Sequence, residues 1–493
     1  MYSCTLKSSH SGEDLGGAFM YKQYINGTWC EASNGNIWQV QNPATEELFE
    51  TVAYGNGDDC QNAIDAASAA FPEWSKKNAY QRAEILMRVA ALMKERAKEY
   101  AVLTTQESGK PLMEARGEWV VAAQFFEWYA EESKRTYGHS IPANRNNKRQ
   151  QVILQPIGVV GIITAWNFPV WNACRVWAAA LAAGCTIVCK PSEYTPITAV
   201  LLMQCLADAG VPAGAANLVM GEADGIGKAM LSDARVRKMH FVGSTRVGKI
   251  LLAGAAETNT KLSLELGGNA PVLIFEDVDI EKVAVSAVAA KYRNCGQVCV
   301  SPQRFLVHEK HYARFVELVK NQVEKFKVGN GLEAETNIGP LVNARQREGV
   351  QNVVNEAVAA GATLICGGNI PHEKGFFYSP TVLADVEQSN PAFRKEIFGP
   401  VMVISSFSTQ KEAVEMANDT EYGLCSYVWT NDLNTSIYVS EALEFGMVGI
   451  NEWTVHSIET PFGGWKQSGL GYECGTEGIM EYLEKKLISI GSL

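Results

Sequence analysis

Apolar residues recur at intervals of three and four positions over residues 61–74, 80–98 and 112–134. That spacing places them on one face of a helix, so it predicts three amphipathic helices. Residues 138–150 are polar, include a proline and follow no period. They predict a loop or an edge element outside the core.

From residue 159 onward, short continuous apolar runs alternate with helical stretches. The pattern predicts strands at 159–164, 186–190, 217–220, 238–243 and 261–268, and helices at 175–183, 197–210 and 246–256. Continuous apolar strands that alternate with helices indicate a parallel sheet covered on both faces. Such sheets bind ligands beyond the carboxyl ends of their strands, so residues at those ends are candidates for chemistry.

A second series of the same kind begins at residue 271. It predicts strands at 271–275 and 304–308, helices at 279–294, 311–325 and 342–360, and a terminal strand within 484–493. The expected fold class is therefore α/β, with two doubly wound parallel-sheet domains. A chain of 493 residues has room for two or three such units.

Composition and charge narrow the classes of function. Hydrophobic residues make up 47% and charged residues 20% of the chain, which is typical of a globular protein. A net charge of −11 disfavours nucleic acid and anionic membranes as partners. The most apolar segment, 156–189, is interrupted by Asn167, Pro169, Asn172 and Arg175, so it does not predict a membrane span. Since the N-terminus has no signal-peptide pattern, we expect a cytoplasmic protein.

The twelve cysteines follow neither a disulfide pattern nor a metal pattern. Many lie in apolar runs, as free buried thiols do, and none belongs to a C-x-x-C pair. The C-x3-C pairs have no paired histidines nearby, so we expect no metal. One such pair, in NCGQVCVS, is Cys295 and Cys299. From spacing alone, either cysteine is a nucleophile that needs a base or a filler of the core, and the choice stays open.

Two turns that follow predicted strands carry residues suited to a dinucleotide. In FVGSTRVGK, Gly243 permits a tight turn and Ser244 can cap a helix and bind a phosphate. The alternative is an ordinary turn with a serine cap. In CKPSEYTP, Lys190 and Glu193 are placed either to hold a ribose diol or to form a salt-bridged loop.

Two further polar residues interrupt apolar segments. Glu265 lies in SLELGGNAP, where a buried carboxylate is costly unless it is paired or protonated. It is a candidate general base with a raised pKa, or else a structural glutamate bonded to backbone amides. Asn167 lies in ITAWNFPVWNACR at the end of the first strand. Its amide can donate to a developing oxyanion, or it only caps the next helix.

These segments belong to a larger set of blocks. The set comprises WNFP (166–169), KPSEYTP (190–196), FVGSTRVG (241–248), LELGGNAP (264–271), GQVCV (296–300), EIFGPV (396–401) and PFGGWKQSGLG (461–471). In this order and over nearly the whole chain, the set resembles the aldehyde dehydrogenase superfamily, and most closely the succinate-semialdehyde dehydrogenases. The resemblance implies NAD(P)-dependent oxidation of an aldehyde to a carboxylic acid, with succinate semialdehyde as the first candidate substrate.

The resemblance also implies a role for each matching residue. Cys299 matches the nucleophile, Glu265 the base that activates water, and Asn167, with the backbone N–H of Cys299, the oxyanion donor. Cys295 is then expected to be a small buried filler, with a redox partner of Cys299 as the alternative. The residues that match cofactor contacts are Ala165, Trp166, Lys190, Ser192, Glu193, Gly243, Ser244, Gly267, Glu396 and Phe398. Because a carboxylate at Glu193 would repel a 2′-phosphate, we expect NAD in preference to NADP.

The resemblance extends to the substrate, with departures. Arg175 and Arg293 match arginines that hold the distal carboxylate, which suits a guanidinium fork, and two structural arginines are the alternative. Phe462 is expected to line the substrate tunnel. His456 stands where a serine completes the carboxylate site, and Trp453 adds bulk where these enzymes have glycine. Another semialdehyde, a hydroxyaldehyde or an aromatic aldehyde is therefore the alternative substrate.

The family fold implies three parts and an oligomer. They are an NAD-binding domain (1–136 and 158–264), a catalytic domain (265–450) and a small β oligomerisation arm (137–157 and 478–493), with 451–477 returning to the cofactor domain and the tunnel. The arm implies a homodimer or a homotetramer. A thiol hydrolase or a silent binding scaffold is the competing class of function. The intact set of Cys299, Glu265, Asn167, Lys190 and Glu193 disfavours the silent scaffold.

Overall fold

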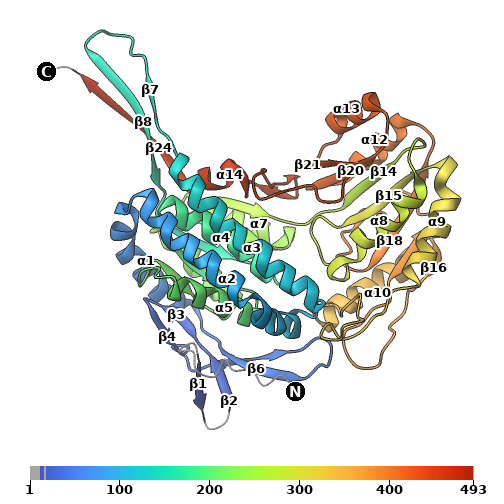
Figure 1. Cartoon of the computed structure of the whole chain (residues 1–493), viewed down its shortest axis with the longest axis horizontal. Coiled ribbons are helices and arrows are strands. Elements are labelled where there is room, and N and C mark those ends of the chain that lie inside the picture. Colours follow the sequence, from blue (N-terminus) through green and yellow to red (C-terminus); the bar gives the residue numbers. More distant parts are fainter. Residues whose placement is uncertain (1–11, 16–17, 492–493) are drawn as a thin grey trace.

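The computed structural model describes residues 12–15 and 18–491 of the chain. Cys4 and the parts of the predicted ranges 1–136 and 478–493 that fall on the other positions lie outside the described residues. Figure 1 shows two lobes and a projecting arm, and each lobe is built around one large sheet. The prediction of an α/β fold with two such sheets is confirmed.

The first lobe contains an eight-stranded sheet with a parallel centre. Its order is β23-β13-β12-β9-β10-β11-β3-β4, and its antiparallel edges are β3, β4 and β23. The strands are β3 (Gln23–Ile25), β4 (Thr28–Cys30), β9 (Val159–Ile163), β10 (Thr186–Lys190), β11 (Ala216–Leu218), β12 (Val236–Val242), β13 (Lys261–Glu265) and β23 (Gly469–Leu470). Because β9 to β13 run parallel, their carboxyl ends meet at one edge, where the predicted chemistry also gathers.

Helices cover this sheet on both faces, as the apolar runs of its strands require. They are α1 (Gly57–Lys76), α2 (Ala79–Ser108), α3 (Leu112–Glu132), α4 (Pro169–Ala183), α5 (Pro196–Asp208), α6 (Ala223–Ser232) and α7 (Thr245–Ala255). Helix α2 continues ten residues beyond the predicted end at 98 and stops where Gly109 adopts a left-handed conformation with φ of 80°. Helix α4 begins earlier than predicted, because Pro169 occupies its first turn, where a missing N–H costs nothing.

The second lobe contains a seven-stranded sheet of order β16-β17-β18-β15-β14-β20-β21, antiparallel only at β16. Its strands are β14 (Ala270–Ile274), β15 (Pro302–His308), β16 (Thr363–Cys366), β17 (Thr381–Ala384), β18 (Val401–Phe407), β20 (Cys425–Trp429) and β21 (Met447–Ile450). Its main helices are α8 (Ile280–Tyr292), α9 (Glu309–Val323), α10 (Ala344–Ala359), α12 (Gln410–Asn418) and α13 (Leu433–Ala442). The first residues of this lobe follow β13 directly, so the two sheets meet beside Glu265.

The arm is a three-stranded antiparallel sheet that projects from the first lobe (Figure 1). It pairs β24 (Leu483–Gly491) with β8 (Lys148–Pro156), and β8 with β7 (His139–Ile141). The polar segment 138–150 thus holds β7 and the start of β8, an edge element as predicted. A four-stranded sheet of β1 (Gly12–Leu15), β2 (Ala18–Tyr21), β6 (Leu48–Ala53) and β5 (Ile37–Gln41) was not predicted.

Two further observations concern the whole described chain. Among the described residues, no helix combines the length and the apolar character that crossing a membrane requires. The cysteines in this part of the chain are all free thiols, most of them buried. They therefore contribute to stability as small apolar side chains rather than as cross-links.

Candidate active site

A cavity of about 400 Å³ opens where the carboxyl ends of β9, β12 and β13 meet the second lobe. Its lining includes the three predicted catalytic residues Cys299, Glu265 and Asn167. Seven of the predicted cofactor residues also line it, namely Ala165, Trp166, Gly243, Ser244, Gly267, Glu396 and Phe398. Residues that lie up to 233 positions apart in the sequence therefore share one hollow.

Glu265 and Cys299 both line this cavity, and each lies close enough to shift the pKa of the other. Glu265 is the last residue of β13, and burial raises its pKa to about 7, against the opposing charge of Arg175. Burial, and next the charge of Glu265, raises the pKa of the Cys299 thiol well above its ordinary value. The resting pair is thus a protonated thiol beside a carboxyl group that exchanges its proton near neutral pH.

The segment before Cys299 turns sharply. Asn294, Cys295 and Gly296 have positive φ angles of 50°, 56° and 71°, which is a strained conformation for the two residues with side chains. The Asn294 amide holds the turn, because its Nδ2 donates to the carbonyl of Gln297 at 3.2 Å and to that of Asn167 at 2.9 Å. Cys295 is only 2% exposed and packs in the core, which suits the predicted filler.

Asn167 is held by several neighbours. Its Nδ2 donates to the Gln297 carbonyl at 3.2 Å, and its own carbonyl accepts from the ammonium of Lys110 at 2.9 Å. Lys110 is fully buried and paired with Glu118. The other carboxylate oxygen of Glu118 accepts from the N–H groups of Val170 and Trp171, at 2.8 and 3.0 Å, and so caps α4. The buried ion pair therefore fixes the loop that presents Asn167.

Arg175 points into the protein and is already paired. Its Nε lies 2.6 Å from Oε2 of Glu473, its Nη2 lies 3.4 Å from Oε2 of Glu265, and its guanidinium stacks over Phe462 with 4.7 Å to the ring centroid. Glu473 also contacts His240 and was missed by sequence reasoning. The signal was a single acid among small and aromatic residues in GLGYECG.

Neither His456 nor Arg293 lines the cavity around Cys299. The His456 ring packs edge-on against Trp171 and Phe462, with centroid distances of 5.6 and 5.0 Å. Burial, with the charges of Arg175 and Arg293, lowers the pKa of His456 to about 4, so its imidazole is neutral at pH 7. Its Nδ1 is buried without a hydrogen-bond partner.

Arg293 is exposed and lies over the Phe168 ring, with 5.4 Å between guanidinium carbon and ring centroid. It lines a separate cavity of about 310 Å³ whose walls include Val298, Val300 and Trp453. Val298 and Val300, the residues on either side of Cys299, line this cavity, whereas Cys299 lines the first one. The two predicted substrate arginines therefore do not face a common hollow, since Arg175 is buried and Arg293 is at the surface.

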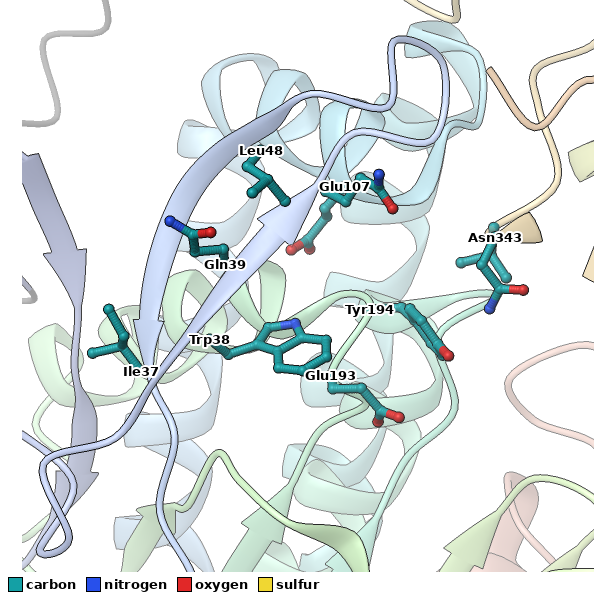
Figure 2. A pocket seen from close by; sticks show the side chains of 10 residues that line it. Ile37, Trp38, Gln39, Leu48, Glu107, Glu193, Tyr194 and Asn343 are labelled. Atoms are coloured by element: carbon teal, nitrogen blue, oxygen red, sulfur yellow. The ribbon is translucent and has the colours of Figure 1, made fainter. Parts of the chain in front are cut away.

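The remaining cofactor predictions lie away from Cys299. Lys190 ends β10, donates to the Pro191 carbonyl at 3.0 Å, and its Nζ is 3.8 Å from the Glu193 carboxylate. Glu193 lines a third cavity, of about 590 Å³, together with Trp38 and Tyr194 (Figure 2). The hydroxyl of Ser192 accepts from the backbone N–H of Tyr194 at 3.3 Å. A salt-bridged loop and a ribose grip are both compatible with this arrangement.

The turn after β12 has the geometry of a serine cap. The Ser244 hydroxyl accepts from the N–H of Val247 at 3.4 Å at the start of α7. Glu396 accepts from the N–H of Gly268 at 2.9 Å, and burial raises its pKa to about 7. The rings of Phe398 and Trp166 meet edge-to-face at 5.5 Å between centroids. Hydroxyl, carboxyl and aromatic groups thus surround this cavity.

Known proteins resemble the chain closely. It is 46% identical over 470 residues to the mitochondrial succinate-semialdehyde dehydrogenase of Oryza sativa subsp. japonica, covering 95% of this chain and 89% of the relative. It is 43% identical over 473 residues to an NADP(+) succinate-semialdehyde dehydrogenase of Escherichia coli K12, covering 96% and 98%. The crystal structure of succinate-semialdehyde dehydrogenase from Burkholderia pseudomallei superposes with a TM-score of 0.94 at 42% identity, covering 95% and 98%.

The name of the E. coli relative corrects one expectation, the preference for NAD over NADP, which was wrong. The physical reason lies in the surroundings of Glu193. Its side chain is 35% exposed and lies 3.8 Å from the ammonium of Lys190. A solvated carboxylate beside a cation can turn towards water or towards that cation, so its charge alone does not exclude a 2′-phosphate.

The family resemblance seen in the sequence is confirmed by a match to a whole-family model. The match extends from residue 29 to residue 488. It therefore includes the parallel strands of both sheets, the cavity around Cys299 and all the predicted site residues. The chain belongs to the aldehyde dehydrogenase family and is an NAD(P)-dependent oxidoreductase that acts on aldehydes.

Proposed function

We propose that this chain oxidises succinate semialdehyde to succinate. The observation that supports the proposal most directly is that Cys299, Glu265 and Asn167 line one cavity, where Cys299 and Glu265 shift each other's pKa. The high identity to succinate-semialdehyde dehydrogenases over most of the chain supports the choice of substrate.

The cysteine supplies the covalent step. Glu265 accepts the thiol proton, and the sulfur of Cys299 attacks the aldehyde carbon, so the carbonyl oxygen becomes an oxyanion. The Nδ2 of Asn167 and the backbone N–H of Cys299 stabilise that oxyanion. Oxidation leaves an acyl thioester on Cys299. After Glu265 has passed the thiol proton to solvent, its carboxylate removes a proton from water, whose oxygen attacks the thioester carbon. The acid and the Cys299 thiolate are released, and the thiolate takes back a proton.

The residues around the cavity fit a nicotinamide dinucleotide. Ser244 and the first turn of α7 would hold a phosphate, Glu396 would accept from ribose hydroxyls, and Phe398 would support the nicotinamide ring. When bound, this cofactor supplies the acceptor for the hydride of the aldehyde carbon. Lys190 and Glu193 would hold the adenosine ribose.

Two arrangements of the substrate are supported by different residues. Arg293, exposed beside Phe168, can bind a distal carboxylate, which favours succinate semialdehyde. His456 is neutral and its Nδ1 is unpartnered, which favours an aldehyde that also carries a hydroxyl group. We propose the first as the main substrate and a hydroxylated semialdehyde as the second candidate.

A substrate panel tests the proposal. Succinate semialdehyde, its hydroxylated analogue and butanal are mixed with the protein and NADP or NAD, and reduced nicotinamide is followed by absorbance. The proposal requires kcat/KM for succinate semialdehyde to exceed that for butanal, which has the same chain length without the carboxylate. Equal values would contradict a carboxylate site. Hydrolysis of esters without nicotinamide reduction by any aldehyde would favour a thiol hydrolase.

We also propose that the three parts of the chain have separate roles, with the boundaries given under sequence analysis. The arm of β7, β8 and β24 would join two copies, because it projects from the body and exposes Leu487 and Ile490 by 58% and 51%. Sedimentation of Leu487→Asp/Ile490→Asp against the unaltered protein tests this. A cytoplasmic location stays a prediction.

A further inference from the structure

The orientation of the Asn167 amide follows from its neighbours. A backbone carbonyl only accepts hydrogen bonds, so the atom of Asn167 that lies 3.2 Å from the Gln297 oxygen must be the nitrogen. The amide oxygen of Asn167 therefore faces the opposite way. There it accepts from Nδ2 of Asn172 at 3.0 Å. One chain of donors and acceptors thus runs from Asn172 through Asn167 to the loop that carries Cys299.

Asn172 is itself firmly held. It lies in the first turns of α4, and its backbone N–H donates to the Phe168 carbonyl at 2.9 Å. Its side chain and that of Asn167 are buried, with residue exposures of 5% and 6%. An amide that rotated by half a turn at Asn167 would place nitrogen against nitrogen at Asn172 and oxygen against oxygen at Gln297. Burial makes such mismatches costly, so one orientation is strongly preferred.

We propose that Asn172 is a positioning residue for aldehyde oxidation, because it holds the Asn167 amide with its nitrogen towards the Cys299 loop. This inference rests on the oxyanion role of Asn167 in the proposed function. Asn172 touches neither aldehyde nor cofactor in this account. It acts by keeping a donor, rather than an acceptor, where negative charge develops.

A purely structural role predicts a different outcome. If Asn172 only satisfied a buried polar position on α4, its replacement would lower stability and leave the chemistry of folded protein unchanged. If it orients Asn167, its replacement would slow the steps that form an oxyanion and spare reactions of Cys299 that form none. The two roles are separated by comparing aldehyde turnover with alkylation of the same sulfur.

The experiment uses Asn172→Leu, which keeps the branching at Cγ but has no donor, and Asn172→Met as a more adaptable second variant. The matched reference is Asn167→Leu, and the double variant Asn167→Leu/Asn172→Leu completes the cycle. For each folded variant, kcat/KM with succinate semialdehyde, the rate of Cys299 alkylation by iodoacetamide, and the midpoint of thermal unfolding are measured. Alkylation by iodoacetamide displaces iodide and forms no oxyanion, so its rate measures only the reactivity of the Cys299 sulfur.

The expected result has three parts. The Asn172 variants lose roughly 10- to 100-fold in kcat/KM, somewhat less than removal of an oxyanion donor. Their alkylation rate stays within about twofold of the unaltered protein, and Asn172→Leu has no further effect once Asn167 is leucine. Unchanged turnover in folded Asn172 variants would overturn the inference. So would losses that multiply in the double variant, or a fall in alkylation equal to the fall in turnover.

The same set separates this inference from the proposed function. If Asn167→Leu itself turns over aldehyde at the normal rate, the oxyanion role is wrong and the proposed mechanism fails. If Asn167→Leu is impaired while both Asn172 variants are normal, the proposed function stands and only the positioning role is refuted.

Discussion

Arg175 and Glu473 form a buried ion pair, with 2.6 Å between Nε of the arginine and Oε2 of the glutamate. The same guanidinium lies 3.4 Å from Glu265. The positive charge of Arg175 is already neutralised by these two carboxylates, so it attracts a substrate carboxylate only weakly. Removal of one partner would also destabilise the protein, because it would leave a buried charge without its counter-ion. Arg293 at the surface is therefore the better candidate to bind a substrate carboxylate, and the two arginines are expected to respond differently to substitution.

Arg293→Ala should raise KM for succinate semialdehyde by about 10- to 100-fold, the loss expected for a hydrogen-bonded charge. The KM for butanal should change little, because that substrate has no carboxylate. Steady-state kinetics with both substrates gives the measurement. A parallel rise in both KM values would mean that Arg293 supports the protein rather than the carboxylate.

Cys299→Ser should reduce aldehyde turnover by about 1,000-fold or more, because a hydroxyl at this position is a far weaker nucleophile than a thiolate. Cofactor binding, followed by quenching of protein fluorescence, should persist. Cys295→Ser is the matched control four residues away and should keep most of the activity. Loss of activity in Cys295→Ser alone would contradict both assignments.

Glu265 should shape the pH profile. A general base works as the carboxylate, and burial raises the pKa of Glu265 to about 7, so kcat should rise as pH increases through about 7. Glu265→Gln cannot accept a proton, so it should slow both the attack by Cys299 and the hydrolysis, remove this rise, and leave the acyl-enzyme that does form on Cys299.

Mass spectrometry of Glu265→Gln after one turnover measures that acyl-enzyme as an added succinyl group. A profile with the same rise near pH 7 in Glu265→Gln would assign the titration to another group. Glu396 is the alternative, since burial raises its pKa to about 7 as well. Glu396→Gln is therefore the appropriate comparison.

Lys110→Met should destabilise the protein by about 3–5 kcal/mol, because it leaves the Glu118 carboxylate buried without its partner. The double variant Lys110→Met/Glu118→Gln should recover part of that loss, since both charges are gone. Urea unfolding of the three variants provides the free energies. A double variant less stable than Lys110→Met would contradict charge burial as the cause.

Polar site residues that interrupt an apolar strand pattern could be predicted from the sequence. Glu265 breaks an apolar strand and Asn167 ends one, so both are evident from the sequence, whereas the choice of Cys299 over Cys295 depends on the family resemblance. Strands β9 to β13 were predicted for the same reason, since parallel strands read as continuous apolar runs. The short strands before residue 54 lack such runs and were missed.

Contacts that depend on distant segments were not predictable. Lys110 meets Asn167 57 positions later, and nothing in the local pattern reveals that the lysine is buried. Arg175 looked free for a substrate because Glu473, its partner, comes almost 300 positions later. The NAD preference failed for a related reason. The carboxylate of Glu193 suggested repulsion of a 2′-phosphate. Whether Glu193 excludes that phosphate depends on the exposure of its side chain and on the neighbouring ammonium of Lys190.

The bond from Asn167 to the Gln297 carbonyl joins the first lobe to the loop that carries the nucleophile, two residues before Cys299. Without this hydrogen bond, thermal motion of one lobe relative to the other would change the distance between the Cys299 sulfur and the Asn167 amide. Because of this hydrogen bond, a displacement of the loop also moves the Asn167 amide, so the distance between the amide and the Cys299 sulfur is kept. The same bond therefore keeps the sulfur and the amide aligned at the bond being made.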